Sequence, residues 1–295
     1  MVGYFFIYYL SLVGKKNNKR DTKMQYPKLT FIGTGNMAWA IIQGLLKSGY
    51  PASQIIACNK SNQTRRNELQ AVGIATQFTN REAVEQAEVI VLAVKPQIMV
   101  EVCTEFADID FSQKIVISVA AGISIARLEQ LLPTAKNIVR TMPNTPALIG
   151  EGLTGLFAKS SVNPTACQLA EKLMSAIGQC HWVDEEHKIN QIIALTGSSP
   201  AYFFRFMEAM QHSAEKMGFS AEDARFLVQQ AALGSAKLVQ ANPDIPLSQL
   251  RENVTSKGGT TAKALEIFEQ QRLAETVEQA MQAAISRANE MEQSL

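Results

Sequence analysis

Apolar residues in the first two thirds of the chain fall in short continuous runs that predict buried strands. The runs cover residues 28–32, 54–58, 88–94, 114–119 and 136–141. Continuous runs are typical of parallel strands that helices cover on both faces, whereas half-exposed strands alternate. Late edge strands are expected at 154–157 and 179–183. The pattern predicts an α/β fold with a doubly wound, Rossmann-type sheet.

From residue 185 onward the strand pattern stops and long helical segments follow. A break at 196–201 precedes a helix at 202–216 that is apolar around most of its circumference. A small helical domain cannot bury such a helix alone, so we expect a second copy of the chain to cover it. The sequence therefore predicts a Rossmann domain over 24–184 and an all-α dimerisation domain over 185–295.

Residues 1–23 combine an apolar run at 4–10 with a basic run at 15–20. The apolar run is too short to span a bilayer, and a secretory signal would carry its charges before the apolar segment. We interpret these residues as a disordered N-terminal extension before a natural start at Met24. A weak interfacial anchor is the alternative.

Charge and composition narrow the class of protein. The formal net charge is +1, so no global field favours nucleic acid or a membrane surface. The four cysteines form no C-x-x-C pair, and the three histidines form no i, i+4 pair, so no metal site is expected. Scattered thiols indicate a reducing, cytoplasmic location.

A glycine turn follows the first strand and opens a helix. Gly33 permits a tight exit from the strand, Gly35 lets the backbone approach a pyrophosphate, and Ala38 allows close helix packing. The unpaired N–H groups of the helix start would face the phosphates. An ordinary tight turn is the alternative for so short a motif.

The end of the second strand bears on the choice of dinucleotide. A NAD site usually places an acidic residue there, on the ribose 2′-hydroxyl, and none follows Cys58. Polar and basic side chains stand there instead, which favours NADP, although a solvated helix start is the alternative. They are Asn59, Lys60, Ser61, Arg65 and Arg66.

Three later strand ends also belong to the predicted crevice, because ligands gather at the carboxyl ends of parallel strands. Ala93 and Lys95 follow the third strand, and the small pair Ala120 and Ala121 follows the fourth. Asn144 stands between two prolines after the fifth, on a stiff loop that suits a contact near the nicotinamide or a rigid turn.

A second glycine-rich segment precedes a late helix. Ser256, Gly258, Gly259, Thr260 and Thr261 offer free N–H groups and hydroxyls at the helix start. Such a start can hold a small carboxylate, since the helix dipole attracts negative charge. An ordinary N-cap with flexible glycines is the alternative.

Six segments in order and register resemble pyrroline-5-carboxylate reductase. They are GTGNM at 33–37, VKP at 94–96, AAG at 120–122, MPNTP at 142–146, TGSSPAY at 196–202 and SKGGTT at 256–261. The resemblance implies reduction of the cyclic imine Δ1-pyrroline-5-carboxylate to L-proline, the last step of proline biosynthesis, with NADPH or NADH. The residues after Cys58 make NADPH the expected preference, with NADH as the alternative. The resemblance also implies a cytoplasmic enzyme of helix-swapped homodimers that can assemble further, for example to a decamer.

The same resemblance implies roles for individual residues. The Gly258–Thr260 backbone would take the substrate carboxylate, and the catalytic Thr261 hydroxyl would sit by the ring nitrogen. Lys257 stands where the family usually has a proline, so the loop gains a positive charge and loses rigidity. Contacts to the cofactor would come from Gly33, Thr34, Gly35, Asn36, Met37, Ala38, Asn59, Lys60, Ser61, Ala93, Lys95, Ala120, Ala121, Asn144 and Asn253.

Two other interpretations stay open at this stage. The chain could be another two-domain reductase, of the hydroxyacid or imine type, although such enzymes typically place a lysine or aspartate on the long interdomain helix, where Gly197, Ser198 and Ser199 stand here. It could also be a catalytically silent NADP-binding protein. The intact segment 258–261 argues against the second.

Overall fold

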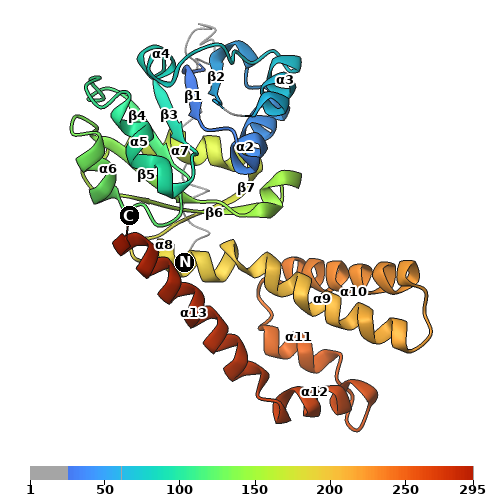
Figure 1. Cartoon of the computed structure of the whole chain (residues 1–295). Helices are drawn as coiled ribbons and strands as arrows, with labels where there is room; N and C mark the ends of the chain where they lie inside the picture. Colours follow the sequence, from blue (N-terminus) through green and yellow to red (C-terminus); the bar gives the residue numbers. More distant parts are fainter. Residues whose placement is uncertain (1–25, 61, 295) are drawn as a thin grey trace, which may run out of the picture.

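The computed structural model describes residues 26–60 and 62–294, and a seven-stranded sheet forms the core of its first half (Figure 1). The strand order is β2-β1-β3-β4-β5-β6-β7. Strands β1 to β5 are parallel, β6 is antiparallel to β5, and β7 is parallel to β6. The strands are β1 (Leu29–Ile32), β2 (Ile55–Cys58), β3 (Val89–Leu92), β4 (Ile115–Ser118), β5 (Asn137–Met142), β6 (Gly152–Ala158) and β7 (Gly178–Trp182).

The five predicted parallel strands are confirmed, but one prediction about the late strands is wrong. We expected the strand at 154–157 at an edge, and β6 instead lies between β5 and β7. The chain reverses through a short 3₁₀ helix, η3 (Thr145–Ile149), and Gly150, whose φ of 79° is left-handed. The sequence does not show that β7 would then pair with the outer side of β6 and leave β6 internal.

Alternate residues of the strands face two separate cores, one on each side of the sheet. Phe31 and Val91 pack with the helices α2 (Asn36–Lys47) and α7 (Pro164–Met174). Ile32 and Ile90 pack on the opposite face, against a second set of helices. That set is α4 (Asn80–Gln86), α5 (Met99–Thr104) and α6 (Ile125–Leu131). This double cover explains why the strands are continuously apolar.

A helical arm projects from the sheet domain (Figure 1). It contains α8 (Lys188–Ile192), a π-helical turn η5 (Ile193–Gly197), α9 (Ser199–Lys216), α10 (Ala221–Ala241), α11 (Leu247–Asn253), α12 (Thr260–Gln270) and α13 (Leu273–Ser294). The break expected at 196–201 is reduced to a bend at Ser198. Pro200 falls in the first turn of α9, where its missing N–H would have no partner, so the helix accepts it.

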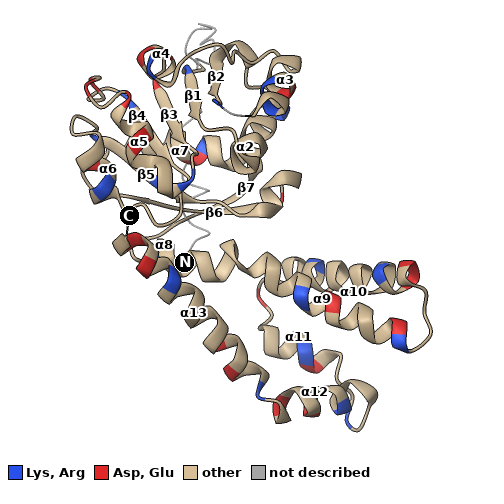
Figure 2. Cartoon of the chain, in the orientation of Figure 1, with Lys and Arg blue, Asp and Glu red and all other residues tan. Residues whose placement is uncertain are grey.

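The arm exposes apolar surface that its own chain does not cover. Phe203 is 67% exposed and Phe204 is 62% exposed, and α9 contains no buried residue. A groove of about 770 Å³ between α9 and α10 is lined by side chains such as Phe206, Met210 and Val239. Figure 2 shows charges of both signs interspersed along these helices. A surface of this kind is typical of a subunit interface.

None of the helices within 26–60 and 62–294 has both the length and the hydropathy needed to cross a bilayer. The predicted extension at 1–23 lies outside the described residues.

Candidate active site

The glycine turn at the end of β1 has the geometry of a nucleotide-binding turn. Gly33 has a φ of 92°, and a Cβ built there would lie 2.7 Å from the Ala93 carbonyl oxygen, so only glycine fits. Gly35 has an ordinary φ of −65°, and no atom lies within 4 Å of a Cβ built on it. The backbone at Gly35 therefore faces open space beside the end of β3.

The helix that follows this turn is open to an anion. Gly35 is the N-cap of α2, with no side-chain cap and no acidic residue in the first turn. By contrast, Asn62, Thr79 and Ser124 cap the helices α3 (Gln63–Ala71), α4 and α6 with their side chains. The first N–H groups of α2 are therefore available for a pyrophosphate, which agrees with the predicted cofactor role of 33–38.

The side chains expected on the ribose side gather next to this turn. The Asn59 Nδ2 donates to the Thr34 hydroxyl, and its Oδ1 accepts from the Asn62 N–H at 2.9 Å. Arg65 donates to Asn36 at 3.3 Å, and its guanidinium lies 4.7 Å from the centre of the Trp39 ring. Ser61 lies outside the described residues. The structure thus brings the end of β2 and the start of α2 together.

The ends of β3 and β4 complete one wall of the crevice. Leu92 pairs with Ile32 on one side and with Ser118 on the other. The residues that follow these parallel strands therefore emerge side by side at the carboxyl ends of the strands. Ala120 is buried, Ala93 and Ala121 are half-buried, and Lys95 is exposed. Small side chains here leave room for a flat ligand to approach the backbone.

Asn144 uses its whole amide for bonds to the backbone. Its Nδ2 donates to the Thr196 carbonyl at 3.0 Å, and its Oδ1 accepts from the Leu153 N–H at 2.9 Å. These bonds tie the loop after β5 to the π-helical turn and to β6. The side chain therefore supports the loop, and a direct contact with the cofactor stays a prediction.

The second glycine-rich segment also forms an uncapped helix start. Gly259 is the N-cap of α12, with no side-chain cap and no acidic residue in the first turn. Gly258 has a left-handed φ of 72°, and a Cβ on Gly259 would collide with Ser256. Thr260 and Thr261 are exposed, as is Lys257. This start can accept a carboxylate on its free N–H groups.

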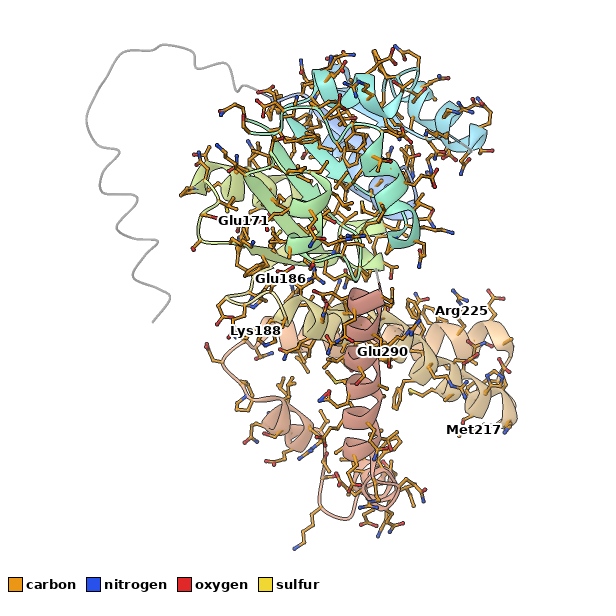
Figure 3. The ribbon with its side chains drawn as sticks, turned by 60° about the vertical axis from the view of Figure 1, so that its left-hand side comes forward. Glu171, Glu186, Lys188, Met217, Arg225 and Glu290 are labelled. Atoms are coloured by element: carbon orange, nitrogen blue, oxygen red, sulfur yellow. The ribbon has the colours of Figure 1, made fainter. Side chains whose placement is uncertain are left out.

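A single chain does not bring the two glycine-rich segments together. Figures 1 and 3 both place α12 at the end of α13 that lies away from the sheet. The 22 residues of α13 span about 33 Å at 1.5 Å per residue. Asn253, at the end of α11, lies on the same arm. The predicted substrate residues are thus remote from the cofactor turn of their own chain.

An ionic cluster that the sequence analysis missed joins α13 to the sheet. Arg140 on β5 is 1% exposed and donates to Glu186 at 2.9 Å and to Asn190 at 2.9 Å. It also donates to both carboxylate oxygens of Glu292, at 3.3 and 3.2 Å. Figure 3 labels Glu186 at the junction of the sheet domain and the helical arm. The signal in the sequence was a charged residue inside an otherwise buried strand.

The cluster fixes the last turns of α13 against the turn at 120–122, which belongs to the predicted cofactor crevice. Glu186 also accepts from the Ile125 N–H at 2.7 Å, next to the turn at 120–122. A Cβ on Gly122 would lie 3.2 Å from the Met291 Cβ, so α13 packs directly on that turn. We therefore assign Arg140 and Glu292 a positioning role.

The two buried thiols, Cys58 and Cys103, offer no nucleophile at neutral pH. Burial raises the pKa of Cys58 to about 11 and the pKa of Cys103 to about 12. A protonated, buried thiol is unreactive. Within 26–60 and 62–294, no group of three or more His, Cys, Asp or Glu side chains could hold a metal ion.

Comparison with known proteins agrees with this geometry. Residues 186–291 match the model of pyrroline-5-carboxylate reductase dimerisation, so the helical arm is a dimerisation domain. Residues 28–122 match the model described as NADP oxidoreductase, coenzyme F420-dependent. Pyrroline-5-carboxylate reductase of Pasteurella multocida is 53% identical over 273 residues, covering 91% of this chain and 99% of that protein. The enzyme of Pseudomonas aeruginosa is 41% identical, covering 92% of this chain and 99% of that protein.

Solved structures support the same assignment. A pyrroline-5-carboxylate reductase from Coxiella burnetii superposes with a TM-score of 0.84 at 40% identity, covering 90% of this chain and 99% of that one. The Plasmodium falciparum pyrroline carboxylate reductase with NADP bound gives a TM-score of 0.80 at 30% identity, covering 91% and 99%. The resemblance inferred from six short segments is confirmed, and the chain belongs to the pyrroline-5-carboxylate reductase family.

Proposed function

We propose that this protein reduces Δ1-pyrroline-5-carboxylate to L-proline in the cytoplasm, with NADPH as the preferred cofactor and NADH as an alternative. One observation supports this proposal above the others. Among the described residues, two helices begin at a glycine without a side-chain cap, and one start is suited to a pyrophosphate and the other to a carboxylate. These are the two anions that an imino-acid reductase must hold.

The two halves of each site come from different subunits in this proposal. The turn at 33–38 of one subunit would meet the segment at 256–261 of another, because the two lie far apart within a chain. The exposed apolar face of α9 and α10 would be covered in the same dimer. Further assembly of dimers, for example to a decamer, is part of the proposal.

The division of the chain follows from this arrangement. We assign residues 24–184 to the NADP-binding domain and 185–295 to the dimerisation and substrate domain, with 1–23 as an extension. The last strand ends at Trp182 and α8 begins at Lys188, which is consistent with a boundary between them.

In this reaction the protein mainly binds the substrate and the cofactor and aligns them. When bound, the reduced nicotinamide supplies the hydride for the imine carbon. The N–H groups at Gly258–Thr260 would orient the substrate by its carboxylate, and the small residues at 120–122 would let the two rings stack. Thr261 would hydrogen-bond the ring nitrogen. Because a threonine hydroxyl is a poor acid, the proton comes from water or from an imine already protonated.

The preference for NADPH rests on charge. Lys60 follows β2, where an NAD site would carry a carboxylate, and Arg65 lies in the first turn of α3. A 2′-phosphate carries about −1.5 to −2 charges at neutral pH, so cations nearby favour it.

Replacing Thr261 by valine tests the proposed reaction. We expect kcat/KM for pyrroline-5-carboxylate to fall about 10- to 100-fold, because the hydroxyl that aligns the ring nitrogen is lost while the shape is kept. Affinity for NADPH and the melting temperature should stay unchanged, since the side chain is exposed. Steady-state kinetics with both substrates would provide the measurement.

Thr165→Val provides the matched control. Thr165 is an exposed threonine that occupies, in α7, the same second helical position that Thr261 occupies in α12. The Thr165→Val variant should keep kcat/KM within twofold of the wild type, which is a change of about 0.4 kcal/mol in activation free energy. Full activity of Thr261→Val would remove Thr261 from the mechanism.

A further inference from the structure

A carboxylate lies at the ribose end of the crevice although none follows β2 in the sequence. Lys60, just after β2, forms an ion pair with Glu105, just after α5. Forty-five residues separate the two, so the fold alone brings the acid to this place. The lysine side chain is 68% exposed and the glutamate side chain 27% exposed.

The Glu105 carboxylate is held by a second contact, whereas the Lys60 side chain is mostly exposed. The second oxygen of Glu105 accepts from the Asn80 Nδ2 at 3.0 Å, and Asn80 is buried at the start of α4. The nearby Arg81 is committed to Asp108, with bonds of 2.6 and 3.0 Å. The Glu105 carboxylate is therefore held in place by Asn80, and the exposed Lys60 side chain reaches to it.

The second cation at this end is restrained in a different way. Arg65 is 14% exposed, is paired with Glu68 at 2.8 Å, and lies over the Trp39 ring. Both contacts restrain its guanidinium. Of these two cations Lys60 is the more exposed, and its acidic partner comes from a distant part of the chain, whereas the partner of Arg65 is its helix neighbour Glu68.

We propose that Glu105 sets the choice between NADPH and NADH by competing with the adenosine 2′-phosphate for Lys60. An NADPH molecule must break the Lys60–Glu105 pair and place its phosphate near a fixed carboxylate, and like charges repel. NADH has no 2′-phosphate and binds without disturbing the pair. Glu105 therefore reduces a preference that Lys60 and Arg65 would otherwise make strong. This inference rests on the proposed binding of NADPH.

Glu105→Gln is the direct test, because the amide keeps the shape and can still accept from Asn80. Isothermal titration calorimetry with adenosine 2′,5′-bisphosphate and with 5′-AMP would measure the affinity of the adenosine site with and without the 2′-phosphate. Neither ligand takes part in catalysis. We expect the bisphosphate to bind about tenfold more tightly and 5′-AMP to change less than twofold. The ratio of kcat/KM for NADPH over NADH should rise by about the same factor, through KM.

Two further variants separate a specific effect from a general change of charge. In a Lys60→Met background, Glu105→Gln should leave the ratio of bisphosphate to 5′-AMP affinity unchanged. Asp108→Asn removes another carboxylate of the same region, one that pairs with Arg81 rather than with Lys60, and should change bisphosphate affinity less than twofold.

The inference is overturned if Glu105→Gln leaves bisphosphate affinity unchanged, tightens 5′-AMP equally, or acts just as strongly without Lys60. Those results would leave the proposed function standing, since the wild type would still bind the bisphosphate and NADPH. A wild-type protein that binds neither ligand would overturn the cofactor assignment, and the inference with it.

Discussion

Replacing Gly35 by alanine should weaken NADPH binding about 100-fold, or about 2.7 kcal/mol, while the protein without cofactor stays as stable as the wild type. The φ of −65° suits any residue, and no atom lies within 4 Å of the added Cβ, so the fold accepts the methyl group. The same open space is where a pyrophosphate would approach the start of α2, and a methyl group there keeps it away. Fluorescence titration with NADPH and a thermal melt would measure the two effects.

Gly33→Ala provides the contrast at the same turn. Its φ of 92° and the 2.7 Å approach to the Ala93 carbonyl mean that alanine strains the fold itself. We expect the free energy of unfolding to fall by about 1–3 kcal/mol or more. If Gly35→Ala bound NADPH normally, the turn would not hold the pyrophosphate.

Replacing Arg140 by methionine should lower the free energy of unfolding by about 3 kcal/mol. The substitution leaves Glu186, Glu292 and Asn190 without the donor that they share. Removing one partner of a buried ion cluster costs more than the pair itself contributes, because the remaining charges stay poorly solvated. Urea unfolding at one fixed protein concentration would measure the loss, since a dimer's stability depends on concentration.

Lys159→Met is the matched control, because Lys159 and Glu129 form an ion pair between two elements but are 43% and 42% exposed. Exposed pairs contribute about 0–1 kcal/mol, so this variant should stay close to the wild type. In Arg140→Met, hydrogen exchange should also speed up in the last turns of α13. Equal stability of the two variants would contradict the positioning role of Arg140.

The parallel strands and the glycine turn could be predicted because their signals are local. A strand covered on both faces must be continuously apolar, and a tight exit beside a phosphate needs glycine at fixed spacing. The uncapped helix starts at Gly35 and Gly259 are also local signals, because a capping side chain lies within a few residues of the helix start in the sequence.

The features that the sequence analysis missed all depend on residues far apart in the chain. Arg140 meets Glu292 across 152 positions, and Lys60 meets Glu105 across 45. The internal place of β6 depends on where β7 returns to the sheet. No local pattern marks such pairs, so the acid at the ribose end became visible only in the fold.

The helical arm shows that assembly can be predicted when a segment carries more apolar surface than its own domain can bury. The helix at 202–216 carried more apolar surface than a small domain can bury, and the structure leaves Phe203 and Phe204 exposed in the single chain. The match of 186–291 to a dimerisation domain supplies the missing partner. In the proposed site, the same partner would bring Thr261 to a cofactor turn.

Mixing two inactive variants tests most directly whether each site is built from two subunits. Gly35→Glu would place a carboxylate in the pyrophosphate space. Gly258→Asp would place one at the substrate carboxylate, at a left-handed φ of 72° that aspartate tolerates better than most residues. Each variant alone should be inactive. Random co-assembly should restore about a quarter of wild-type activity, because one site in four then combines two unaltered halves from different chains. Activity no higher than that of the separate variants would mean that the site does not cross the subunit interface.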